Sequence, residues 1–174
     1  MRIFKEEQRF TQWWVWLILI AVMLIPLYGI VQQFIFKKPF GDKPMSDNGL
    51  IIFCIGMFFF LAFFLSLKLK TRIDEVGIHY QFSPIHLSKK TITWLELKSA
   101  NTRRYYAITE YGGWGIKSGF LSRKSKGIAY NVSGDQGIQL VLTSGQKILI
   151  GTQKESEVNA VLKTYSSKTK TDEI

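Results

Sequence analysis

An unbroken apolar run over residues 49–67 dominates the pattern of hydrophobic and polar positions along the chain. Its nineteen residues include no Asp, Glu, Lys or Arg, and Lys68 and Lys70 follow it at once. A helix of this length reaches about 28 Å, close to the hydrocarbon thickness of a bilayer. A buried helix of a soluble core is the alternative, but such a helix seldom carries phenylalanine on every side. The run therefore predicts a membrane span.

A second apolar run over residues 13–36 precedes it. The run opens with Trp13, Trp14 and Trp16, whose amphipathic rings are typical of the headgroup level of a membrane. Pro26 lies inside it, which a membrane helix tolerates with a kink. The run is longer than the apolar part of a signal peptide and shows no small-residue cleavage site. We therefore expect a retained span.

The connection between the two runs, residues 37–48, is too short for a domain and contains two prolines and a glycine. Residues 1–67 are thus predicted to form a two-helix transmembrane hairpin, after a short polar lead over residues 1–12. Basic residues are enriched on the cytoplasmic side of membrane proteins. The connection carries three of them, Lys37, Lys38 and Lys43, and the opposite side carries six: Arg2, Lys5, Arg9, Lys68, Lys70 and Arg72. Both termini are therefore expected in the cytoplasm.

The pattern changes after residue 67 to an alternation of apolar and polar positions, which is typical of strands. Short strand-like segments separated by turn signals indicate antiparallel hairpins in a barrel or sandwich. The expected strands are residues 68–74, 77–82, 90–93, 101–107, 127–132, 137–142 and 146–150, with a turn of helix near residues 94–99.

The last element is expected to be an amphipathic helix. Thr152 and Glu155 have the spacing of a capping box. One apolar stripe at helical spacing follows, formed by Val158, Val161, Leu162 and Tyr165. Residues 68–165 are thus predicted to form one β-rich domain closed by a C-terminal helix, and residues 166–174 a disordered charged tail.

This order of strands and one closing helix resembles the plan of pleckstrin-homology (PH) domains. The segments EYGGWGIKSG, KGIAYNVSG and QGIQLVLTSGQKILIGTQ resemble an uncharacterised family of two-span bacterial proteins that is common in Bacteroidetes-type bacteria. The resemblance implies a membrane α-helical hairpin followed by a mainly-β PH-like barrel or sandwich with a C-terminal capping helix. It implies location in the bacterial inner membrane but no established activity, and a PH-like fold suggests a binding scaffold only by analogy.

Charge narrows the choice of partners. Residues 68–174 hold 17 Lys and Arg against 9 Asp and Glu, so they carry +8 of the net charge of +10. For a chain tied to a bilayer, this balance favours anionic lipid over nucleic acid, since each Lys or Arg near an anionic leaflet contributes about 1 kcal/mol. Four basic residues are predicted to contact lipid headgroups, with ordinary solvated surface as the alternative: Lys117, Arg123, Lys124 and Lys126. Arg103 and Arg104 form a possible second patch.

The glycine-rich segment over residues 110–119 is the most unusual part of the predicted domain. Gly112, Gly113 and Gly115 surround Trp114 and permit backbone angles that are closed to other residues. We interpret these four residues as a structural turn. An anion-binding nest is the alternative, although the segment lacks the phosphate-loop pattern. Glu110 beside it is the best isolated carboxylate of the domain.

Candidate chemistry for an enzyme is sparse. His79 and His86 are not joined by the further ligands that a metal site needs, and no GxSxG motif marks a nucleophile. The single cysteine, Cys54, excludes an intramolecular disulfide and lies within the apolar run. We therefore expect no catalytic residues, no metal and no cofactor.

The sequence thus favours a non-enzymatic, membrane-anchored PH-like module that binds a protein partner or anionic lipid at the cytoplasmic face, and no nucleic acid. One alternative is an accessory subunit of a membrane transport or secretion complex. Another is a signalling protein that responds to a nucleotide or phosphate through the glycine-rich turn.

Overall fold

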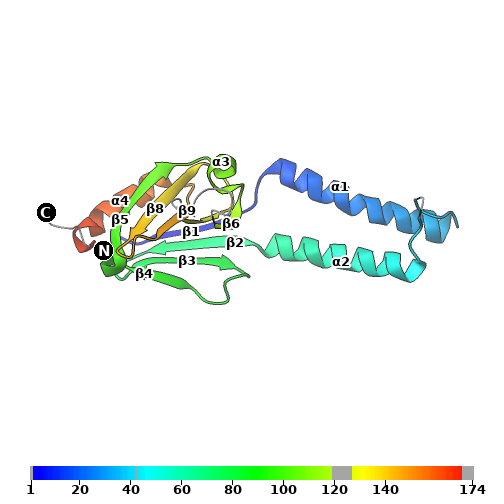
Figure 1. Cartoon of the computed structure of the whole chain (residues 1–174), viewed down its shortest axis with the longest axis horizontal. Coiled ribbons are helices and arrows are strands. Elements are labelled where there is room, and N and C mark those ends of the chain that lie inside the picture. The colour runs from blue at the N-terminus through cyan, green and yellow to red at the C-terminus, as the bar shows by residue number, and fades with distance from the viewer. Residues whose placement is uncertain (1, 42, 119–126, 170–174) are drawn as a thin grey trace. The chain divides into compact units, whose positions relative to one another are not determined.

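The computed structural model describes residues 2–41, 43–118 and 127–169, and the chain divides into two units. The helical unit is Thr11–Ser66, and the β-rich unit combines Met1–Phe10 with Leu67–Ile174. The helical unit contains two long helices, and the β-rich unit contains two sheets and a C-terminal helix (Figure 1). The predicted order of two apolar helices, a mainly-β region and a final helix is confirmed.

The helical unit contains α1 (Trp13–Ile30), which continues as a π-helical turn (Val31–Ile35), and α2 (Asp47–Ser66). Both helices are long and apolar enough to cross a membrane, by length and composition. Their surfaces are largely uncovered, since 11% of the most apolar window of each is buried. Near the connecting turn, the side-chain amide of Gln33 donates to the backbone oxygen of Met45 (2.8 Å) and to Asp47 Oδ1 (2.6 Å).

The first sheet of the β-rich unit is an antiparallel meander in the order β1-β2-β3-β4. Its strands are β1 (Phe4–Arg9), β2 (Lys68–Ile73), β3 (Gly77–Ser83) and β4 (Lys90–Thr93). Strand β1 lies in the segment that the sequence analysis left as a polar lead. It pairs with β2 from Phe4 opposite Ile73 to Arg9 opposite Lys68, so the whole helical unit is an insertion between two neighbouring strands.

The second sheet has the order β5-β8-β9-β7-β6, with all pairs antiparallel except β7 and β9. A 3₁₀ turn (Trp94–Glu96) leads into it, and the short helix α3 (Ala107–Tyr111) follows its first strand. Its strands are β5 (Leu97–Arg104), β6 (Gly115–Ser118), β7 (Ile128–Asn131), β8 (Gln136–Leu142) and β9 (Lys147–Gly151). Apolar side chains from both sheets form one core, which includes Leu69, Phe82, Ile138, Leu140 and Ile150.

Helix α4 (Glu155–Tyr165) adds its apolar stripe to this core. All four predicted stripe residues are buried, and the ring of Tyr165 stacks on Trp94 with centroids 5.2 Å apart. Ser166–Lys168, at the start of the segment predicted as a tail, form a 3₁₀ turn. Residues 170–174 lie outside the described part of the chain.

The predicted capping box at the start of α4 is wrong. The cap position is Lys154, which makes no side-chain cap hydrogen bond. The hydroxyl of Thr152 instead donates to Glu6 Oε2 (2.7 Å), and Glu155 accepts from Thr102 (3.2 Å). The Thr152 N–H, from which Glu155 would accept in a capping box, donates to the Gln136 oxygen (3.0 Å), and the Thr152 hydroxyl accepts from the Lys154 N–H (3.1 Å). A genuine capping box joins Thr93 and Glu96 at the 3₁₀ turn before β5.

The strand pairing predicts how the β-rich unit can be separated from the helices. Because Arg9 lies opposite Lys68, replacing residues 11–66 by an Asn-Gly turn should convert β1 and β2 into a simple hairpin. We expect this hairpin-linked protein to be soluble and to unfold cooperatively in urea, with a β-rich circular-dichroism spectrum.

Residues 67–174 alone should be much less stable, because they lack β1 and its buried Phe4. Loss of a core phenylalanine costs about 3–5 kcal/mol. Equal urea midpoints for the two proteins would contradict the role assigned to β1.

Candidate functional site

The solvent-facing side of the first sheet carries rows of polar side chains, and we call it the outer face. The strand register aligns Lys5, Arg72, His79 and Thr91 in one row across the four strands. The next row contains Glu7, Lys70 and Gln81, and the third contains Arg9, Lys68 and Ser83. Alternate positions, such as Phe4, Leu69, Tyr80 and Ile92, are buried in the core. The pleat of the sheet thus separates a buried, mostly apolar side, which also holds Gln8 and Thr71, from a charged and exposed one.

Basic side chains outnumber carboxylates on the outer face. Glu7 lies among three of them: its oxygens are 3.0 Å from Arg9, 3.7 Å from Lys68 and 4.0 Å from Lys70. The hydrogen bond from Arg9, helped by the charges of Lys68 and Lys70, lowers the pKa of Glu7 despite some burial. One carboxylate therefore holds three cations together, and this part of the face keeps an excess of positive charge.

A shallow depression of about 370 Å³ opens on the outer face. Its lining comes from three adjacent strands and from the segment before β4, and holds four cations, Lys5, Lys70, Arg72 and Lys89, against two carboxylates, Glu6 and Glu7. Lys5 and Arg72 lie directly opposite each other on neighbouring strands. Like charges in that position repel, and the ion pair of Arg72 with Asp74 (2.8 Å) offsets part of this repulsion. The chemistry of the depression therefore suits an anionic group such as a phosphate.

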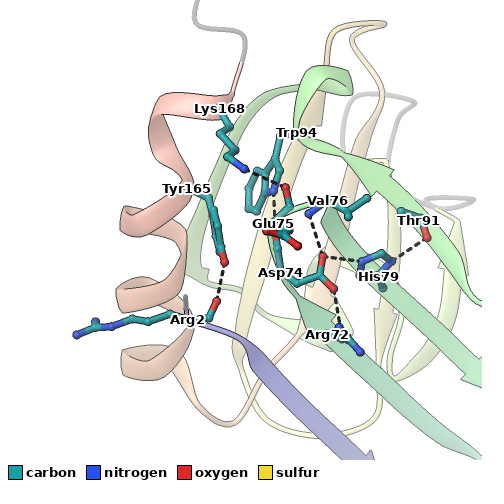
Figure 2. A network of polar contacts seen from close by, with 10 residues as sticks. All are labelled: Arg2, Arg72, Asp74, Glu75, Val76, His79, Thr91, Trp94, Tyr165 and Lys168. Atoms are coloured by element: carbon teal, nitrogen blue, oxygen red, sulfur yellow. Dashed lines mark hydrogen bonds and ion pairs between the residues drawn. The ribbon is translucent and has the colours of Figure 1, made fainter.

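Asp74 organises one edge of this face, as Figure 2 shows. Its Oδ1 lies 3.0 Å from His79 Nε2 and accepts a hydrogen bond from the Val76 N–H (3.0 Å). Its Oδ2 accepts from Arg72 Nε (2.8 Å), and His79 Nδ1 lies 2.8 Å from the hydroxyl of Thr91. The carboxylate thus closes the turn between β2 and β3 and connects three strands through one imidazole.

The protonation of Asp74 follows from these contacts. Burial alone would raise its pKa, but the hydrogen bonds from His79, Val76 and Arg72 outweigh burial and lower the pKa to about 2. The same turn is held from the core side, where Trp94 Nε1 donates to the Asp74 backbone oxygen (2.9 Å). It is also held from the C-terminal turn, where Lys168 Nζ lies 3.3 Å from the Glu75 backbone oxygen. We interpret the group as a structural clasp that orients Arg72 and His79.

The structure places one of the four predicted lipid-binding residues, and it lies outside the outer face. Lys117 is partly exposed on β6, in the second sheet. Arg123, Lys124 and Lys126 lie outside the described residues, so the contact of these four residues with lipid stays a prediction. Sequence reasoning did not single out the cations of β1 and β2 as one surface, because β1 was not predicted to be a strand.

The glycine-rich turn uses its backbone N–H groups internally. Gly112 ends α3 with φ of 77°, and its N–H donates to the Ile108 oxygen (2.8 Å). The Gly113 N–H donates to the Ala107 oxygen (2.8 Å), and the Gly115 N–H to Asn131 Oδ1 (2.9 Å). Trp114 packs against the small cluster around Tyr105. These contacts favour a helix-ending turn over an anion nest, which needs free N–H groups.

Glu110 is not the isolated carboxylate that the sequence suggested. The guanidinium of Arg103 donates to both of its oxygens, at 2.9 and 3.3 Å, and the Tyr106 N–H donates to it at 2.9 Å. Arg104 pairs in turn with Asp135. The possible second basic patch is therefore neutralised by carboxylates from α3 and from the segment before β8.

The two histidines occupy different environments. His79 belongs to the Asp74 clasp, whereas the ring of His86 lies against Tyr80 and Tyr130, with centroids 6.2 and 5.3 Å away. Burial, together with the charge of Lys90, lowers the pKa of His86. In the described part of the chain, no three or more His, Cys, Asp and Glu side chains gather as a metal site would require.

Neither protein-family models nor curated proteins match the chain. Function therefore has to be inferred from the chemistry of the described residues.

The Asp74 clasp leads to a pH prediction, best measured on the hairpin-linked protein. Because folding lowers the pKa of Asp74 from 3.8 to about 2, its contribution to stability should be complete above about pH 5 and lost as the pH falls towards 2. Asp74→Asn should reduce the free energy of unfolding by about 1–3 kcal/mol at pH 7.

The difference between Asp74→Asn and the unchanged protein should shrink in urea titrations as the pH falls from 5 to 2. Glu75→Gln is the matched control, because only the backbone oxygen of Glu75 takes part in the network of Figure 2. A constant difference across this pH range would exclude the clasp as the source of the effect.

Proposed function

We propose that the protein is a non-enzymatic binding module anchored by two membrane spans, whose outer face binds anionic lipid headgroups at the cytoplasmic surface of a bacterial inner membrane. One observation carries this proposal. The two apolar helices are inserted between the neighbouring strands β1 and β2, and the pair of residues next to the insertion, Arg9 and Lys68, is basic.

The strand pairing supports two retained spans. Antiparallel neighbours require the chain to leave the β-rich unit and to return to it on the same side of the membrane, which two spans accomplish and one span does not. Cleavage of α1 as a signal peptide would remove β1 and with it the buried side chains of Phe4 and Gln8. The uncovered apolar surface of both helices also needs a nonpolar environment. The count of Lys and Arg around the spans favours the cytoplasm for the β-rich unit.

The outer face supports lipid as the ligand. Arg9 lies four residues before the start of α1 at Trp13, and Lys68 lies two residues after the end of α2 at Ser66. Side chains at such positions lie at headgroup depth when the helices span a bilayer, where each cation gains about 1 kcal/mol from an anionic leaflet. The depression beside them, with Lys5, Lys70 and Lys89, would take a lipid phosphate. A PH-like plan of two sheets and a closing helix agrees with a binding role by analogy alone.

Topology is tested with reporters at both ends of the full chain. A reporter after Ile174 and one before Met1 should both be active in a cytoplasmic assay and inactive in a periplasmic one. Both in the periplasm would reverse the orientation, and reporters on opposite sides would refute the pairing of β1 with β2 across two spans.

Lipid binding is tested by the thermal stability of the full chain in mild detergent. Added phosphatidylglycerol should raise the unfolding midpoint and phosphatidylcholine should not, because a ligand that binds only the folded state stabilises it. Lys5→Gln combined with Lys70→Gln should abolish most of the rise, and the rise should decrease with salt.

The matched control combines Lys147→Gln with Lys163→Gln, which removes two exposed charges from β9 and α4. An equal loss of lipid response in both double variants would mean that net charge, and not the outer face, attracts the lipid.

A further inference from the structure

The connection between β3 and β4, residues 84–89, presents two apolar side chains to solvent. Ile85 is 52% exposed and Leu87 is 95% exposed, the highest value among the large apolar residues of the described chain. Lys89 and Lys90 follow them and are also exposed. We call residues 84–89 the β3–β4 loop. Single exposed apolar residues are common on protein surfaces. The contacts that hold Ile85 and Leu87 in this loop therefore decide whether their exposure is significant.

The loop is fastened to the sheet by the residue between them. The Phe82 N–H donates to His86 Nδ1 (3.2 Å), and the His86 N–H donates to the Phe82 oxygen (2.8 Å). The His86 ring lies against Tyr80 and Tyr130. The side-chain amide of Gln81 donates to the His86 oxygen (3.0 Å), with a longer contact to that of Leu87. Because His86 is held inwards, the side chains of Ile85 and Leu87 on either side of it are held outwards.

The loop lies at the end of the first sheet where the chain leaves for the helices and returns from them. Ser83, the last residue of β3, pairs with Lys68, which pairs with Arg9. Neighbouring strands lie about 5 Å apart. The loop therefore starts at the same end of the strands as the two connections to the helices. Val76 and Leu95 are also exposed and apolar, but they lie near the opposite end of the strands, where Gly77 pairs with Thr93.

We propose that the β3–β4 loop is an interfacial anchor, which inserts Ile85 and Leu87 into the headgroup–acyl boundary of the leaflet that α1 and α2 enter. This inference rests on the two spans of the proposed function. Apolar tips followed by lysines match the chemistry of that boundary, where alkyl side chains enter the acyl region and ammonium groups meet phosphates. The loop would thereby hold the outer face and its depression against the lipid.

The experiment uses the full chain with Cys54→Ala, so that single cysteines can be labelled with the environment-sensitive fluorophore NBD. Leu87→Cys is the test position. Leu95→Cys, 77% exposed near the opposite end of the strands, is the matched control, and Phe60→Cys in α2 reports the span. Each protein is reconstituted into vesicles of phosphatidylcholine and phosphatidylglycerol. Quenching is then measured with acrylamide in the water and with lipids that carry spin labels at shallow or deep positions.

The Leu87→Cys label should emit at shorter wavelength than the Leu95→Cys label, resist acrylamide and be quenched most by the shallow spin label. The Phe60→Cys label should be quenched most by the deep one. If Phe60→Cys behaves as expected but Leu87→Cys is as accessible to acrylamide as Leu95→Cys, the loop inference is wrong and the spans stand. Protection of Leu87→Cys from acrylamide without quenching by lipid labels would also overturn it, since a protein or a second copy would then cover the loop. If Phe60→Cys is not quenched by lipid labels, the two-span proposal itself fails.

Discussion

The pairing of β1 with β2 is the constraint on which the rest of the protein depends. Phe4 enters the core at one end of this ladder, and Arg9 lies opposite Lys68 at the other, where the chain departs for the helices. The entropic cost of closing a loop grows only slowly with its length. Two neighbouring strands can therefore be joined by a helical unit, provided that the two ends of this unit lie close together. The helical unit and the sheet therefore impose one condition on each other: residues 10 and 67 must lie side by side.

The buried side of β1 is held by polar contacts rather than by apolar packing alone. The side-chain amide of Gln8 donates to the Gly151 oxygen (2.7 Å), and Glu6 accepts from the Thr152 hydroxyl and the Gln153 N–H. These bonds connect the first strand to the junction of β9 and α4. The N-terminal strand thus joins the sheet that carries the outer face to the helix that closes the core, which explains why so polar a segment is ordered.

The same ladder creates the charged surface proposed as the binding site. Lys5, Glu7 and Arg9 alternate with buried positions of β1, and the register places them beside Lys68, Lys70 and Arg72. The Asp74 clasp fixes one end of this surface, at the turn between β2 and β3. His86 fixes the β3–β4 loop at the other end, next to the connections to the helices. Both anchors are side chains held by several hydrogen bonds or ring contacts, and such support keeps the surface in one conformation before any ligand arrives.

The sequence by itself determined the elements whose signal is local. Uncharged runs predicted the two apolar helices, and alternation predicted β2 and β3. The stripe from Val158 to Tyr165 predicted the buried side of α4. Each of these patterns repeats within one element. Only the tertiary structure decided β1, whose inward positions include Glu6 and Gln8. Their partners come more than 140 residues later, and no local period announces them. Thr152 likewise has partners outside the expected cap, because its hydroxyl donates to Glu6 and its N–H to the Gln136 oxygen. For Glu110 the partner is only seven residues away, but the path of the chain from β5 into α3 is what brings Arg103 to it. Local periodicity thus specified the two apolar helices, β2, β3 and α4, while long-range strand pairing decided β1 and which charges share a surface.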